Sequence, residues 1–163
     1  MVSGYSVVGK SLPRIDGLDK VMGRAQFTAD LKLSYMLYGK ILRSPYPHAL
    51  IKNVDVSKAL KIPGVKAIIT GQDVPSRKYG AVPFAGDENA LCIDKARYVG
   101  DEVAAIAATD LYAAEEALEL ITVEYEPLTP VFDPLEAIKP GAPLIHDNVE
   151  NNISAKYIKQ YGD

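Results

Sequence analysis

The alternation of apolar and polar side chains predicts a chain built mostly of short strands. Residues 49–57 alternate most cleanly, and residues 24–30, 36–44 and 65–70 show similar but shorter patterns. A period of two places one set of side chains on the buried face of a half-buried strand. We therefore expect four strands in the first half of the chain.

The second half of the chain predicts a strand–helix–strand unit. Residues 96–100 and 102–109 are expected to be strands, and the second is apolar on both faces, as an interior strand would be. Residues 122–128 alternate again and stop at a proline. A crossover helix over 111–121 between two parallel strands would be right-handed.

The helix at residues 111–121 has the clearest helical pattern of the chain. Thr109 or Asp110 is expected to cap its first turn, because a short polar side chain there can accept a hydrogen bond from a free backbone N–H. Apolar residues should line its buried stripe and glutamates its opposite face. The stripe is Leu111, Ala114, Leu118 and Ile121, and the opposite face is Glu115, Glu116 and Glu119.

Segments rich in turn residues separate these elements. Residues 1–23 predict an extended arm with turns, and residues 71–90 predict a long loop. Short helices are expected at 58–62 and at 133–139, where Asp133 would cap the helix and Pro134 would take its first position. The resulting class is α+β.

Composition narrows the functional classes. The chain has 163 residues, of which 48% are hydrophobic and 24% charged, as in an ordinary globular domain, and its net charge is −3. No run of lysine and arginine is longer than two residues, so the sequence does not indicate nucleic-acid binding. The longest apolar run, Val103–Ala108, is too short to cross a membrane. Residues 1–10 lack the pattern of a secretory signal, so we expect a cytoplasmic location.

Residues 42–50 contain the strongest candidate for chemistry, because Arg43, Tyr46 and His48 lie close together in the sequence. His48 could be a general base or a metal ligand. It has no second histidine, cysteine or carboxylate at ligand spacing, which favours a structural histidine hydrogen-bonded to the backbone. The flanking prolines suit a rigid connection between two strands.

The other reactive residues do not complete a site. Cys92 is the single cysteine, and its apolar neighbours predict a small buried thiol. Asp101 and Glu102 should point to opposite faces of a strand, so they should not share a substrate. We therefore assign no catalytic, cofactor-binding or metal-binding residue to this chain.

Four ordered motifs resemble one known family. They are "RSPYPHA" (43–49), "PGV" (63–65), "YVGDEVAA" (98–105) and "AAEEALELITVEYEPL" (113–128). Together with the segments around them, they resemble the N-terminal domain of the molybdopterin-binding large subunit of molybdenum hydroxylases. That family includes xanthine dehydrogenase, aldehyde oxidase, carbon monoxide dehydrogenase and 4-hydroxybenzoyl-CoA reductase.

The resemblance implies an alpha/beta hammerhead, a mixed β-sheet with few helices. It divides the chain into an extended arm (1–23), the hammerhead domain (24–147) and a linker (148–163) toward a molybdopterin-binding region that lies outside this sequence. It implies that the parent enzyme uses a molybdopterin-type molybdenum cofactor, with 2Fe-2S clusters and FAD on other domains or subunits. Those components and the rest of the large subunit are the expected partners, with no nucleic acid and no membrane.

The resemblance also implies a role for the motif residues in contacts between domains. The alternatives are a small autonomous enzyme using Arg43, Tyr46 and His48, and a free-standing interaction module without redox function. The residues expected at an interface are Arg43, Ser44, Pro45, Tyr46, His48, Tyr98 and Gly100.

Overall fold

The computed structural model describes residues 4–80 and 86–162, so parts of the predicted arm (1–3), loop (81–85) and linker (163) lie outside the described residues. The chain divides into two compact units, residues 1–36 and 37–163. The predicted boundaries of arm, domain and linker stay predictions.

The first unit has short helical turns and differs from the sequence prediction at two places. Helix α1 (Gly17–Val21) lies inside the predicted extended arm, with Asp16 paired to Lys20 one turn later at 2.6 Å. The strand predicted at 24–30 is wrong. Its end forms the 3₁₀ helix η1 (Thr28–Asp30), because the Asp30 carboxylate accepts a hydrogen bond from the Phe27 N–H at 3.0 Å and closes a turn.

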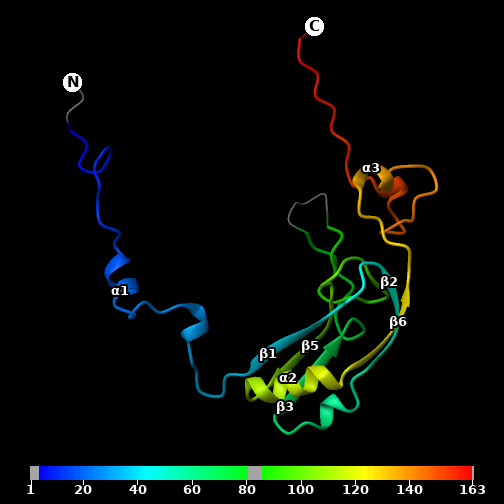
Figure 1. Cartoon of the computed structure of the whole chain (residues 1–163), viewed down its shortest axis with the longest axis horizontal. Coiled ribbons are helices and arrows are strands. Elements are labelled where there is room, and N and C mark those ends of the chain that lie inside the picture. Colours follow the sequence, from blue (N-terminus) through cyan, green and yellow to red (C-terminus); the bar gives the residue numbers. More distant parts are fainter. Residues whose placement is uncertain (1–3, 81–85, 163) are drawn as a thin grey trace. The chain divides into compact units, whose positions relative to one another are not determined.

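The second unit contains two antiparallel three-stranded sheets (Figure 1). In the first, β5 (Glu102–Ala108) lies between β1 (Tyr38–Arg43) and β3 (Val65–Thr70). Ile41 and Ile69 both pair with Ala105, which fixes the register of all three strands. The strands predicted at 36–44, 65–70 and 102–109 are confirmed.

In the second sheet, β2 (Ala49–Asp55) lies between β4 (Lys95–Ala96) and β6 (Thr122–Pro127). The strands predicted at 49–57 and 122–128 are confirmed, whereas the strand predicted at 96–100 does not continue beyond Ala96 because the backbone turns there. The predicted strand–helix–strand order is confirmed by β5, helix α2 (Leu111–Leu120) and β6. Since β5 and β6 belong to different sheets, the condition for a right-handed crossover, two parallel strands of one sheet, is not met.

Helix α2 (Leu111–Leu120) covers one face of the first sheet (Figure 1). The Asp110 carboxylate caps it by accepting a hydrogen bond from the Ala113 N–H at 2.9 Å, so Asp110 and not Thr109 is the capping residue. The predicted stripe is confirmed at Ala114 and Ile121, and Leu118 packs against the same core, but Leu111 does not belong to it. Small side chains let the helix approach the sheet closely, and Leu111 stays 40% exposed at its start. The buried residues of α2 are Ala113, Ala114 and Ala117, followed by Ile121.

Three short helical turns complete the unit. The 3₁₀ helix η2 (Ala59–Lys61) replaces the helix predicted at 58–62, and η3 (Glu150–Asn152) lies in the predicted linker. Helix α3 (Pro134–Ala137) begins as predicted: the Asp133 carboxylate accepts a hydrogen bond from the Leu135 N–H at 2.7 Å.

Val103 joins the cores of the two sheets. It belongs to β5 of the first sheet, is fully buried, and packs in a cluster with Cys92 and Ala96. Ile51 and Tyr125 of the second sheet border that cluster. The prediction that Cys92 is a buried core thiol is confirmed. Strand β5 therefore has one face in the core under α2 and, at Val103, the other face in the core of the second sheet.

The close packing of Gly71 against the backbone near Cys92 can be tested by substitution. A methyl group on Gly71 would overlap the backbone of Cys92 and Ile93, whereas one on Gly39 would make only ordinary contact, 3.8 Å from a carbonyl oxygen. Gly71→Ala should lower the free energy of unfolding by about 3 kcal/mol, measured by urea denaturation. Gly39→Ala is the matched control and should be near neutral; equal stabilities of the two variants would contradict the packing described.

Candidate assembly site formed by two loops

Two loops that are distant in the sequence are hydrogen-bonded to each other beside β1 and β5. The Ser44 N–H donates to the carbonyl of Asp101 at 2.8 Å, and the Gly100 N–H donates to the carbonyl of Ser44 at 2.8 Å. Arg43 donates to the Gly100 carbonyl at 2.7 Å and to the Glu102 carboxylate at 2.6 Å. We call residues 43–48 and 97–101 the two-loop tip.

Each loop of the tip is held by its own turn. The Asp101 carboxylate accepts a hydrogen bond from the Arg97 N–H at 2.8 Å, and Gly100 has a φ of +98°, which a side chain would disfavour. In the other loop, the buried Ser44 hydroxyl accepts from the Tyr46 N–H and donates to the Tyr46 carbonyl, both at 3.1 Å. The tip is therefore stiff without help from a neighbour.

The outer surface of the two-loop tip has several exposed aromatic and apolar side chains. Tyr46 is 37% exposed, Tyr98 51% and Val99 64%, and Pro45 is also exposed. The ring of Tyr46 packs on Tyr125 of β6 with the ring centroids 5.0 Å apart. The Arg43 side chain is also 52% exposed while it pairs with Glu102, so the surface of the tip combines aromatic and apolar groups with one charged side chain. Protein interfaces combine apolar and polar groups in this way.

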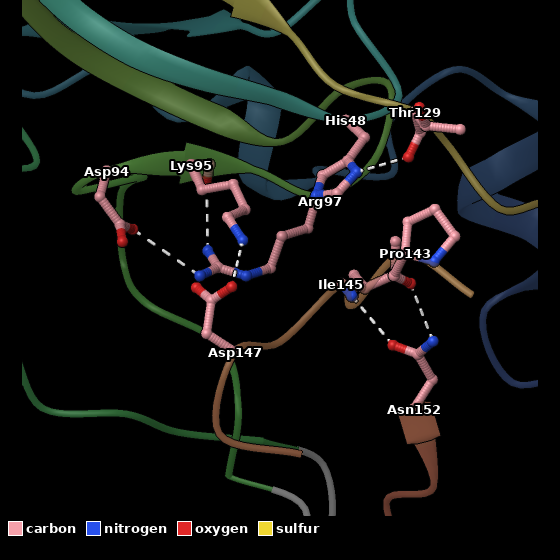
Figure 2. A network of polar contacts seen from close by, with 9 residues as sticks. All are labelled: His48, Asp94, Lys95, Arg97, Thr129, Pro143, Ile145, Asp147 and Asn152. Carbon is pink, nitrogen blue, oxygen red and sulfur yellow. Dashed lines mark hydrogen bonds and ion pairs between the residues drawn. The ribbon is translucent and has the colours of Figure 1, made fainter. Parts of the chain in front are cut away.

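His48 anchors the chain that follows β6. Its ring is 3% exposed, and Nδ1 lies 2.8 Å from the carbonyl oxygen of Thr129, to which Nδ1–H donates in the tautomer we assign (Figure 2). Its backbone carbonyl accepts from the Leu128 N–H at 2.9 Å. Within residues 4–80 and 86–162, Nε2 is buried without a hydrogen-bond partner. The structural interpretation of His48 is confirmed.

A second anchor joins β4 to the segment before η3. The Lys95 ammonium, on a side chain only 6% exposed, pairs with the Asp147 carboxylate at 2.7 Å (Figure 2). The Arg97 guanidinium donates to the Lys95 carbonyl at 3.0 Å. Farther along, the Asn152 amide side chain binds the backbone at Ala137, Pro143 and Ile145.

A cavity of about 230 Å³ lies next to the two-loop tip. Burial and the nearby Arg97 charge lower the pKa of His146, and burial, with Asp101, raises the pKa of the Cys92 thiol, so neither favours a charged form. Asp101 and Glu102 both line this cavity, although they were predicted to point to opposite faces of one strand. Asp101 precedes β5, so the alternation on which that prediction relied does not apply to it. The lining residues are Tyr79, Asp87, Glu88, Asn89, Cys92, Arg97, Tyr98, Asp101, Glu102 and His146.

The cavity does not fit a phosphate-bearing pterin or a metal ion. Its lining contains four carboxylates against one guanidinium, which disfavours an anionic ligand. In the described part of the chain, no group of three or more His, Cys, Asp or Glu side chains is placed to hold a metal ion. The molybdenum cofactor of a parent enzyme would need other residues.

The candidate residues for an autonomous enzyme do not converge. His48 is buried and engaged by backbone, Arg43 is committed to Gly100 and Glu102, and the Tyr46 ring packs on Tyr125. None of the three lines the cavity beside the tip. The structure instead joins the predicted motif residues Arg43, Ser44 and Gly100, a contact that sequence spacing could not indicate; their role at an interface stays a prediction.

Residues 22–129 match the family described as the aldehyde oxidase and xanthine dehydrogenase a/b hammerhead domain. The chain belongs to this family. The resemblance noted from the motifs and the predicted hammerhead class are both confirmed, with the sheet component realised as two antiparallel sheets.

Curated relatives are subunits of related enzymes. The chain is 44% identical to a probable xanthine dehydrogenase subunit of Bacillus subtilis, covering 92% of this chain and 20% of the relative. It is 39% identical to the nicotinate dehydrogenase large molybdopterin subunit of Eubacterium barkeri, covering 100% of this chain and 38% of the relative. The chain thus spans a minor part of each relative.

Solved structures agree with this assignment. A crystal structure of the Cu,Mo-CO dehydrogenase matches 87% of this chain and 18% of that chain, with a TM-score of 0.78 and 35% identity. Aldehyde oxidoreductase from Desulfovibrio gigas matches 83% of this chain and 16% of that chain, with a TM-score of 0.76 and 31% identity. In the described part of this chain, no helix has the length and apolar character needed to span a membrane.

The Lys95–Asp147 pair predicts an asymmetric response to mutation. Asp147→Asn leaves a buried ammonium without its counterion and should lower the free energy of unfolding by about 1–3 kcal/mol. Lys95→Met removes the buried charge and leaves a solvated carboxylate, so it should cost less. Urea denaturation at pH 7 measures both; a greater loss for Lys95→Met would contradict the assignment of the buried partner.

The same pair predicts a pH dependence. The hydrogen bond from Lys95 holds the pKa of Asp147 below its usual 3.8, so the stabilisation is complete above that pH and is lost as the pH falls through the lower, folded-state pKa. Wild type and Asp147→Asn should therefore converge in stability in that acidic range. A stability difference that grew toward low pH would contradict this linkage.

The hydrogen bond from His48 predicts that a variant of this residue loosens the chain after β6. His48→Ala removes the hydrogen bond to Thr129 and should increase amide hydrogen exchange after β6, with a loss of about 1–2 kcal/mol in unfolding free energy. Tyr46→Phe keeps the aromatic contact with Tyr125 and serves as the control. Unchanged exchange in residues 128–149 of His48→Ala would overturn the anchor.

Proposed function

We propose that this chain is a non-catalytic N-terminal domain, or small subunit, of a cytoplasmic molybdenum-dependent hydroxylase or dehydrogenase. In this proposal it assembles the large subunit and contributes to its contacts with the iron–sulfur and FAD components. The parent enzyme uses a molybdopterin-type molybdenum cofactor held by residues outside this chain. Membership of the hammerhead family and the similarity to large molybdenum subunits support this interpretation.

The two-loop tip is the observation that carries the assembly role. Its hydrogen bonds are made internally, by Arg43, Ser44 and Gly100, so binding a partner would not need to order the loops first. Preorganised surfaces lose less conformational entropy on association. The exposed aromatic and apolar side chains then supply the contact, with Tyr98 and Val99 the most exposed of them.

The proposed assembly role does not require a ligand in the acidic cavity beside the tip. Its carboxylates lie near the loop that contains Tyr79, and the Tyr79 hydroxyl donates to the Asn89 carbonyl at 3.1 Å. The polar lining supports the shape of the loops, and the proposal assigns it no substrate. The parent enzyme's substrate depends on residues that would surround the molybdenum.

The alternative is a free-standing interaction module without redox function. It would use the same tip, so the tip alone does not separate the two. The family assignment and relatives named as dehydrogenase subunits favour the enzyme. The two proposals differ in the composition of the complex that this chain forms.

Purification of the native complex through an affinity tag on this chain tests the proposal. The complex should contain non-haem iron, acid-labile sulfide and FAD, together with polypeptides whose sequences contain the corresponding binding regions. Val99→Glu places a charge on the tip and should reduce co-purified iron and flavin by at least about tenfold, because a charge is poorly tolerated at the centre of an interface.

Leu60→Glu is the matched control, since Leu60 is 51% exposed on η2, outside the tip. It should leave iron and flavin content at the wild-type level. A wild-type complex that contained neither iron nor flavin would favour the interaction module, and equal losses in both variants would remove the tip from the proposed interface.

A further inference from the structure

One face of the first sheet is apolar and open to solvent. Two rows cross the strands on this face: Gly39 pairs with Ala107 and Ala107 with Ala67, and the next row contains Ile41, Ala105 and Ile69. Ile41 and Ile69 are each 42% exposed. We call these six residues the open face.

The open face lies opposite α2. Along β5, side chains alternate, and Ala104, Ile106 and Ala108 pack in the core under the helix. Ala105 and Ala107 therefore point away from α2. The Val103 side chain also points away from α2, like those of Ala105 and Ala107, and it is fully buried against the second sheet. One end of this face is thus covered by the second sheet, whereas Ile41 and Ile69 stay partly exposed.

The solvent-exposed face of the second sheet is polar, unlike the open face of the first. Thr122, Glu124 and Glu126 alternate as exposed positions on β6, followed by the exposed Pro127 at its end, and Glu126 pairs with Lys52 of β2 at 2.6 Å. Antiparallel sheets with one solvated face normally show this polar alternation. None of the six side chains of the open face is charged or forms hydrogen bonds. Charged residues lie at its border: Arg43, two positions after Ile41, is paired with Glu102, and the exposed Lys66 precedes Ala67. The six residues themselves therefore have the character of a covered surface.

We infer that the open face is covered by an apolar, uncharged segment of the remainder of the large subunit. This inference rests on the proposed function. This chain corresponds to 20% of the length of the Bacillus subtilis relative and 18% of the Cu,Mo-CO dehydrogenase chain, so such a subunit has ample polypeptide to supply the segment.

The size and polarity of the six side chains indicate which kind of segment covers the open face. Gly39, Ala67, Ala105 and Ala107 are small and admit close approach of a backbone, and the two isoleucines add apolar contact. Without charge or polar groups, the face gives no steering or hydrogen-bond specificity to a transient partner. It suits a permanent contact within one subunit, because permanent interfaces are more apolar than transient ones.

Thiol labelling of the native complex tests the inference. Ile69→Cys places a thiol on the open face, and Thr122→Cys places a matched thiol on the solvated face of the second sheet. Cys92 gives a low background, because it is 6% exposed. In the iron- and flavin-containing complex, maleimide should label Ile69→Cys at least about tenfold more slowly than in the chain purified alone. Thr122→Cys should label equally fast in both.

The outcomes of this experiment distinguish failure of the covered face from failure of the proposed function. Equal labelling of Ile69→Cys in the complex and the chain alone overturns the covered face and leaves the proposed function standing. Protection that appears only in a homo-oligomer of this chain assigns the face to a second copy and overturns the inference. Absence of an iron- and flavin-containing complex overturns both proposals. Ala67→Cys, which adds little volume to the open face, repeats the test should Ile69→Cys weaken assembly.

Discussion

The packing of β5 between two layers is the constraint on which the rest of the second unit depends. One side of the strand packs in the core under α2, and Val103, on the other side, enters the core of the second sheet. Glu102, at the start of the same strand, binds Arg43 and so helps hold the two loops together. A shift of β5 by one residue would exchange its two faces and dissolve both cores.

This arrangement explains why the residues most suggestive of catalysis build structure instead. Arg43 and Ser44 bind the turn before β5, and His48 binds the chain after β6. Their polar groups hold together a tip that exposes aromatic and apolar side chains. The exposed apolar groups of the tip and the apolar sheet face support the proposed assembly role of this member of the hammerhead family.

The sequence predicted the strands and the main helix because their periodicity comes from burial against a nearby layer. It failed at residues 24–30, where one aspartate closes a turn, and at 96–100, where Gly100 and Asp101 turn the backbone. The contact between Ser44 and Gly100 was also beyond sequence reasoning, since it follows from the register of β1 on β5. The motif resemblance identified the family, whereas the open face required the pairing of all three strands.

The most direct test of the central claim is the molybdenum content of the native complex and of this chain purified alone, measured by elemental analysis. The account predicts molybdenum in the complex at a molar ratio near unity to this chain and none bound by the isolated chain. Molybdenum retained by the isolated chain, or a complete complex without molybdenum, would contradict a non-catalytic domain of a molybdenum enzyme.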